Sequence, residues 1–193
     1  MLAEKLKNKH IILASGSPRR QHFLKELGLD FEIRLKEIDE VYPSKLKRFE
    51  ITDFLSKLKA KPFIKDLKEN DILITADTIV WLENKAIGKP KNLEDAKIML
   101  SNLSGKTHEV ISSISITTKN KQITFNDSTL VTFDILNNKE IEYYISKYKP
   151  YDKAGSYGIQ EWIGYIGIKK IEGNYFNVMG FPINKFYREV TKF

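Results

Sequence analysis

Hydrophobic and polar positions divide the chain into short strands and amphipathic helices. Continuous apolar runs, which are typical of strands covered on both faces, lie at residues 11–14 and 72–81. Residues 31–35 alternate between apolar and polar, as a half-buried strand does. Three further β-rich segments lie at 110–117, 122–133 and 164–171, and the turn between the first two predicts antiparallel pairing.

Five stretches with apolar residues three or four positions apart predict helices. The first begins after Ser17, a good N-cap, with Pro18 at its first position and Gly28 as its stop. Pro62 ends the second helix, and Asn138 caps the fourth. The apolar positions of the other four helices are Ile51, Phe54, Leu55 and Leu58; Leu93, Ala96, Leu100 and Leu103; Ile141, Tyr144, Ile145 and Tyr148; and Ile183, Phe186, Tyr187 and Val190.

The turn between the first strand and the first helix, residues 15–20, is a candidate anion site. Arg19 and Arg20 lie in the first helical turn, where the helix dipole disfavours a cation by roughly 0.3–1 kcal/mol. A bound anion would compensate, because small residues such as Ser15 let backbone N–H groups and guanidinium groups approach its oxygens. The alternative is an ordinary capped helix whose arginines point to solvent or pair with acidic residues elsewhere.

Asp77 is the one carboxylate inside the apolar run at 72–81. A buried carboxylate is unfavourable unless it is paired, hydrogen-bonded or metal-bound. Asp77 is therefore a candidate site residue, and the alternative is an Asp at a strand end that caps a turn.

Composition limits the class of protein. The 193 residues fit one domain or two tightly packed lobes, and 41% hydrophobic with 30% charged residues is typical of a soluble globular protein. The chain contains no Cys, which makes a reducing compartment, the cytoplasm, the expected location. The segment before residue 11 is too short and polar for a signal peptide or a membrane span.

The net charge of +7 favours an anionic partner, either nucleic acid or a phosphorylated small molecule. Most of the excess is Lys spread along the chain, without the clustered basic and aromatic residues of a nucleic-acid site. The three histidines lack metal-ligand spacing, and neither a P-loop nor a dinucleotide fingerprint is present.

Four charged residues suggest a polyphosphate site. Lys59 and Lys89 lie near the ends of predicted elements. Glu40 follows a predicted strand and is a second candidate carboxylate in addition to Asp77. Lysines neutralise phosphate oxygens, whereas carboxylates hold a hard divalent cation such as Mg²⁺ or Mn²⁺ and orient a water molecule. Hydrolysis of a phosphate ester or anhydride requires both functions.

Six segments in a fixed order, at residues 13–20, 76–80, 88–90, 103–108, 152–160 and 177–182, carry a resemblance to a known family. With them the chain resembles the Maf family of nucleoside triphosphate pyrophosphatases nearly end to end. The resemblance implies one domain over residues 1–193, with an α/β fold of a mixed sheet, flanking helices and two lobes around a cleft, similar to inosine triphosphate pyrophosphatases. It also implies hydrolysis of a nucleoside triphosphate to monophosphate and pyrophosphate with Mg²⁺ or Mn²⁺.

Site roles follow from this resemblance. Asp77 matches the family's proposed general base, and Glu40 matches an acidic residue that lines the family's cleft. Asp77 and Glu40 are the candidate metal ligands. The residues that match substrate contacts are Ser15, Arg19, Arg20, Lys59, Thr78, Lys89 and Gln160. The region between Glu40 and Lys59 departs from the family's pattern, so that Lys57 and Lys61 are alternatives for Lys59.

The resemblance also implies a substrate class. Arg19, Thr78 and Gln160 match members that act on dTTP and UTP, whereas relatives that act on 7-methyl-GTP differ at these places. The expected partner is thus a nucleoside triphosphate, with no nucleic acid and no membrane, and a homodimer is a candidate assembly. The alternative functions are a cell-division interaction protein, a nucleic-acid-binding domain and a pyrophosphatase for purine triphosphates such as ITP.

Overall fold

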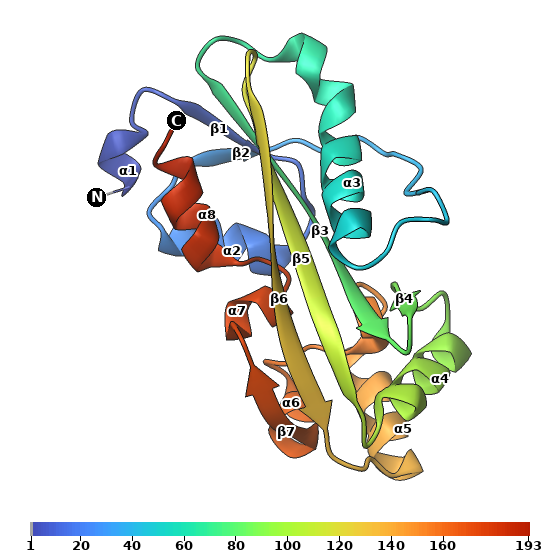
Figure 1. The fold of residues 1–193 in the computed structure, drawn as a ribbon. Coiled ribbons are helices and arrows are strands. Elements are labelled where there is room, and N and C mark those ends of the chain that lie inside the picture. Colours follow the sequence, from blue (N-terminus) through green and yellow to red (C-terminus); the bar gives the residue numbers. More distant parts are fainter. Residues whose placement is uncertain (1) are drawn as a thin grey trace. The chain divides into compact units, whose positions relative to one another are not determined.

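The computed structural model describes residues 2–193 and shows a mixed α/β fold (Figure 1). Its seven-stranded sheet has the order β2-β1-β3-β5-β6-β7, with β4 beside β3, and helices flank it. The strands are β1 (His10–Leu13), β2 (Phe31–Ile33), β3 (Asp71–Leu82), β4 (Lys85–Ile87), β5 (Thr107–Thr117), β6 (Gln122–Phe133) and β7 (Ile168–Glu172). The α-helices are α1 (Leu2–Lys5), α2 (Pro18–Glu26), α3 (Phe49–Ala60), α4 (Leu93–Leu103), α5 (Asn138–Tyr148), α6 (Trp162–Gly167), α7 (Tyr175–Val178) and α8 (Ile183–Val190).

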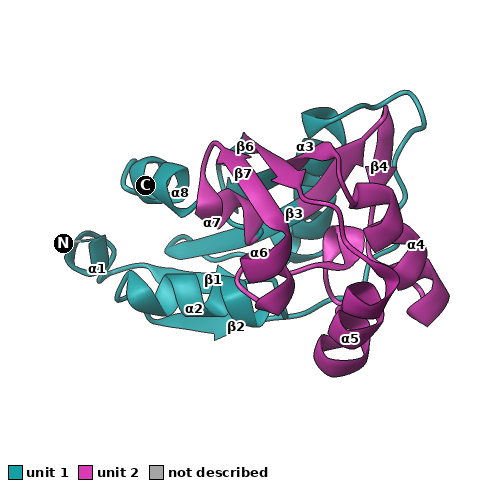
Figure 2. Ribbon diagram, turned by 90° about the horizontal axis from the view of Figure 1, so that it is seen from below, with its two compact units in different colours: residues 1–77, 112–127, 180–193 teal, residues 78–111, 128–179 magenta. Residues whose placement is uncertain are grey.

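The chain divides into two compact units (Figure 2). The first unit contains residues up to 77 together with 112–127 and 180–193, and the second contains 78–111 and 128–179. Strands β3, β5 and β6 each contribute residues to both units. The expected single domain over residues 1–193 stays a prediction, and residue 1 lies outside the described residues.

Parallel strands form the centre of the first unit. β1 pairs in parallel with β2 on one side and with β3 on the other, and Ile11, Ile12 and Leu13 are buried between them. Because β2 and β3 lie on opposite sides of β1, the two right-handed connections place α2 and α3 on opposite faces of the sheet (Figure 1). The carboxyl end of β1 and the middle of β3 therefore lie between these two helices.

The ends of α2 lie where the sequence places them, with one difference in capping. Pro18 is the first helical residue, and Gly28 has the left-handed φ of +70° that a helix stop requires. Ser17 is the N-cap residue, but its hydroxyl makes no capping hydrogen bond. Its N–H group instead donates to Ser15 Oγ at 3.3 Å.

The second unit has its own hydrophobic core between α4, α5 and the sheet. Ala96, Leu100 and Leu103 of α4 pack in one cluster with Ile141 and Tyr144 of α5. The N-cap of α5 is Asn137, and the prediction of Asn138 is wrong by one residue. Asn137 and Glu140 form a reciprocal capping box that the spacing of Asn138 cannot provide.

Three burial or element predictions are wrong for local reasons. The predicted strand at 164–171 is correct only for residues 168–171, which lie in β7, whereas residues 164–167 belong to helix α6. The apolar run suggested a strand there, although Tyr165 and Ile166 are exposed. Leu93 and Tyr187 are exposed on α4 and α8 instead of facing a core. Residues 31–35 are largely exposed because β2 is an edge strand.

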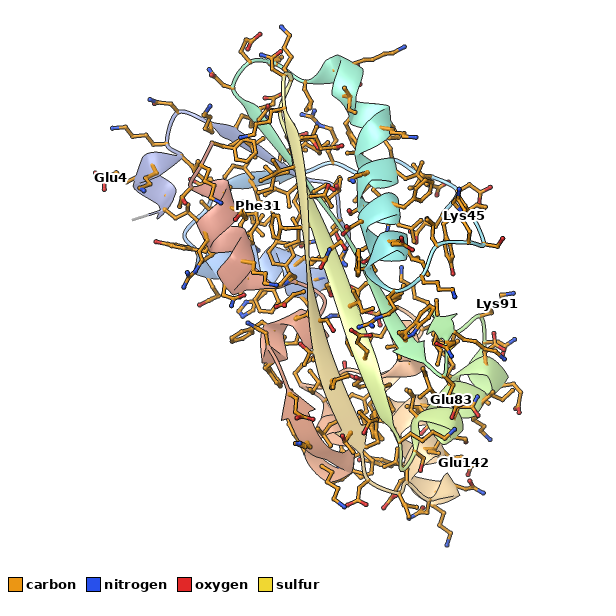
Figure 3. The ribbon with its side chains drawn as sticks, viewed as in Figure 1. Glu4, Phe31, Lys45, Glu83, Lys91 and Glu142 are labelled. Carbon is orange, nitrogen blue, oxygen red and sulfur yellow. The ribbon has the colours of Figure 1, made fainter. Side chains whose placement is uncertain are left out.

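The lysine excess lies largely at the surface. Lys45, before α3, and Lys91, before α4, are both exposed side chains that point outward (Figure 3). Within residues 2–193, no helix is both long and apolar enough to cross a bilayer.

A buried histidine in the second unit makes folding stability depend on pH. His108 Nε2 pairs with the Tyr157 hydroxyl at 2.7 Å, and the ring stacks on Phe133. Burial lowers the pKa of His108 from 6.5 to about 4. The unfolded chain therefore binds this proton more readily, and stability falls by up to about 1.4 kcal/mol per pH unit as pH drops from 6.5 toward 4.

We expect His108→Gln to flatten this acid limb of the stability profile, because Gln takes up no proton. Urea unfolding between pH 4 and pH 7 measures the slope for both proteins. Equal slopes for the native protein and the variant would show that other groups cause the acid sensitivity.

Candidate active site

Asp77 is a buried carboxylate in the middle of β3. It is surrounded by apolar strand residues such as Ala76 and Ile79, which are also buried. The alternative that Asp77 ends a strand and caps a turn is therefore wrong. A central strand fixes this side chain more firmly than a loop would.

Lys59 lies between Asp77 and a second carboxylate. It belongs to the last turn of α3, and its Nζ is 2.6 Å from Asp77 Oδ1 and 3.1 Å from Glu40 Oε1. Glu40 comes from the segment between β2 and α3. Lys57 and Lys61 are exposed, so the geometry distinguishes Lys59 from the two neighbouring alternatives.

The second carboxylate oxygen of Asp77 accepts no hydrogen bond from the described residues. Asp77 Oδ2 is buried and finds no hydrogen-bond partner among residues 2–193. Burial raises the pKa of the Asp77 carboxyl, while the adjacent Lys59 ammonium and the Arg20 guanidinium oppose that rise. An unsatisfied buried oxygen beside a cation can accept a proton or bind a metal ion.

Arg20, at the start of α2, hydrogen-bonds to two backbone segments that are distant in the sequence. Its Nε donates to the Gly180 carbonyl at 3.1 Å, and its Nη1 donates to the Ala76 carbonyl at 3.0 Å and to Ser15 Oγ at 3.3 Å. Burial lowers the pKa of Arg20 to about 10, which leaves it charged at neutral pH. Arg20 is therefore a structural tie that also brings positive charge toward Asp77 and Glu40.

The predicted site residues belong to both units. The structure brings together Ser15, Arg20, Glu40, Lys59 and Asp77 in the first unit, and Arg19 is close enough to lower the pKa of Arg20. The other predicted residues, Thr78, Lys89 and Gln160, belong to the second unit.

Those three residues have different surroundings in the second unit. Thr78 follows Asp77 along β3, so that the two side chains point to opposite faces of the sheet. Lys89 is exposed just after β4. The side-chain oxygen Oε1 of Gln160 is buried and has no hydrogen-bond partner within the described residues.

A buried charge network, which the sequence pattern does not predict, orders the loop before Gln160. Lys153 is buried and pairs with Glu161 at 3.1 Å and with Asp152 at 2.7 Å. The Tyr144 hydroxyl donates to Glu161 and accepts from the Gly158 N–H group. The available signal was the Asp-Lys pair at the start of the segment 152–160, which is rich in small residues, but the pattern alone does not show that these charges become buried.

Metal binding would rest on few protein ligands. Among residues 2–193, no group of three or more histidine and acidic side chains is placed to hold a metal ion. Asp77 and Glu40 are thus the two candidate ligands that share a neighbour, Lys59. Two carboxylates fit a Mg²⁺ ion that takes its remaining ligands from water and substrate phosphates.

Comparisons with known proteins give consistent matches. Residues 10–193 match the family model described as Maf-like protein. The chain is 59% identical over 187 residues to a dTTP/UTP pyrophosphatase of Flavobacterium psychrophilum, covering 97% of this chain and 96% of that protein. It is also 59% identical over 192 residues to a dTTP/UTP pyrophosphatase of Christiangramia forsetii, covering 100% and 98%.

A solved structure shows the same fold at low sequence identity. The Staphylococcus aureus Ham1 protein matches with a TM-score of 0.53 and 16% identity, over 95% of this chain and 99% of that one. The expected mixed sheet with flanking helices is confirmed.

Proposed function

The chain belongs to the Maf-like protein family, and we propose that it hydrolyses dTTP and UTP to the nucleoside monophosphate and pyrophosphate. Relatives 59% identical over nearly the whole chain carry the name dTTP/UTP pyrophosphatase, which supports this substrate pair. The single observation that carries the chemistry is the buried Asp77, whose Oδ2 is unpartnered among the described residues and whose Oδ1 contacts Lys59. We place the reaction in the cytoplasm, which fits a chain without Cys.

Asp77 acts as the general base. Its Oδ2 takes a proton from the attacking water, and burial assists because a raised pKa strengthens the carboxylate as a base. The water oxygen bonds to the α-phosphorus, the bond from that phosphorus to the bridging oxygen breaks, and pyrophosphate leaves. Lys59 and Arg20 supply positive charge near the reacting phosphate.

Asp77 and Glu40 would hold a divalent cation, Mg²⁺ or Mn²⁺. The Asp77 carboxylate and the half-exposed Glu40 carboxylate, whose side chain is 46% exposed, already share one cation, Lys59, and so fit a hard cation that also binds substrate oxygens. When bound, such an ion neutralises phosphate charge and lowers the pKa of a bound water.

The remaining predicted residues are proposed to contact the nucleotide. Arg19 and Lys89 would bind phosphate oxygens, because both are cations with some exposure. Gln160 would contact the base, because its unpartnered Oε1 is an acceptor suited to a base N–H group. The substrate contact of Thr78 rests on the resemblance alone, since its side chain and that of Asp77 point to opposite faces of the sheet. A homodimer stays the candidate assembly.

A nucleotide panel tests this proposal. We expect kcat/KM for dTTP and UTP to exceed that for GTP, ITP and 7-methyl-GTP by at least about tenfold, since a site that hydrogen-bonds one base leaves buried groups unpaired with another. Pyrophosphate release, measured with Mg²⁺ and with Mn²⁺ and corrected for free phosphate, gives the rates.

Three outcomes would contradict the proposal. Higher rates on ITP would support a purine enzyme, and higher rates on 7-methyl-GTP would overturn the pyrimidine assignment. Release of phosphate instead of pyrophosphate would contradict attack at the α-phosphorus.

A further inference from the structure

Lys59 occupies the place between two carboxylates where a free cation would be expected to bind. Its Nζ contacts Asp77 Oδ1 and Glu40 Oε1, while Asp77 Oδ2 has no partner among the described residues. The side chain of Lys59 is only 16% exposed, so its charge is poorly screened by solvent. These contacts make Lys59 the counter-ion of the two acidic groups when no nucleotide is bound.

We propose that Lys59 is a tethered cation that competes with the divalent metal ion for Asp77 and Glu40, so that metal binding and the release of Lys59 are one coupled step. This inference rests on the proposed function, which supplies the metal and a triphosphate. Once released, the Lys59 ammonium group has lost its carboxylate partners, and the phosphate oxygens of the substrate can replace them. Substrate therefore promotes metal binding by giving Lys59 another partner.

Electrostatics give the direction of the coupling. An ammonium and a divalent cation repel each other, and within about 4 Å at a partly buried site this repulsion is strong. A protein without the Lys59 charge leaves two carboxylates that lack their counter-ion, and a metal ion satisfies them. A lysine on another face of the same helix, such as the exposed Lys57, lacks this effect because solvent screens its charge.

Binding of Mn²⁺ alone to the nucleotide-free protein tests the proposal. We expect Lys59→Met to bind Mn²⁺ at least about tenfold more tightly than the native protein, as the free Mn²⁺ signal in electron paramagnetic resonance reports. Lys57→Met, which removes the same charge from the same helix, should leave the affinity unchanged. Unchanged or weaker binding by Lys59→Met, or an equal gain in both variants, would overturn the proposal.

A second measurement uses the native protein and needs no variant to fold. Limited acetylation followed by peptide mass spectrometry gives the reactivity of Lys59 relative to Lys57. We expect saturating Mn²⁺ to raise this ratio severalfold, because Lys59 leaves the carboxylate pair, and a ratio that stays constant or falls would overturn the inference. Neither experiment involves turnover, so both results are independent of the nucleotide panel. If the panel shows no hydrolysis of dTTP or UTP, that result contradicts only the proposed reaction.

Discussion

Asp77→Asn is expected to lower kcat for dTTP and UTP by roughly 10²–10⁴-fold, because the amide cannot take a proton from water. The change keeps the size of the side chain but removes the charge next to Lys59 and the acceptor lone pairs of Oδ2. Steady-state rates of pyrophosphate release measure the loss, and circular dichroism with thermal melting verifies that the variant is folded.

Asp71→Asn is the matched control for this variant. Asp71 is also a buried Asp on β3, but it pairs with His10 at 2.9 Å and accepts the Lys68 N–H group. We expect its kcat to stay within about twofold of native, with the loss confined to stability. Equal loss of activity in both variants would show that Asp77 acts in folding instead of catalysis. If Asp77→Asn kept most of its activity, Asp77 would not be the general base.

Gly164→Ala should destabilise the protein by at least about 3 kcal/mol, a large cost for one methyl group. A Cβ at Gly164 would lie 1.9 Å from the carbonyl oxygen of Ile159, and that neighbour is backbone that cannot rotate away. Helix α6 or the turn before it must shift, and this turn contains Gln160. For a chain of this size, the corresponding fall in melting temperature is about 6–12 °C.

Gly88→Ala provides the contrast, because a Cβ there meets no atom within 4 Å and the backbone has no left-handed φ. We expect its melting temperature to change by no more than a few degrees, in line with about 0.5 kcal/mol for an ordinary surface substitution. Similar melting temperatures for Gly164→Ala and the native protein would mean that the α6 turn tolerates displacement.

Much of the first unit could be predicted from local sequence. The single carboxylate in a continuous apolar strand identified Asp77, because burial of a charge requires a reason that the strand itself does not supply. Pro18 and Gly28 located the ends of α2, since each has a backbone preference that holds in any context.

Longer-range features could not be predicted in this way. Helical periodicity places Lys57, Lys59 and Lys61 near the same helix end, and only the positions of Glu40 and Asp77 in space distinguish Lys59. The helical conformation of residues 164–167 could not be predicted either, because the apolar run there has no polar interruption that would reveal a helical period. The roles of Lys89 and Gln160 stay predictions that the nucleotide panel and variants at those positions can test.

The hydrogen bonds of Arg20 set a condition on synthesis of the enzyme. Its guanidinium donates to the carbonyl of Ala76 and to that of Gly180, which lies 160 positions after Arg20 along the chain. On a ribosome, the arginine, the strand with Asp77 and α3 all emerge long before residue 180 does. A nascent chain therefore carries the predicted site residues of the first unit before Arg20 can hydrogen-bond to Gly180, and we expect catalytic competence only after residue 180 has emerged.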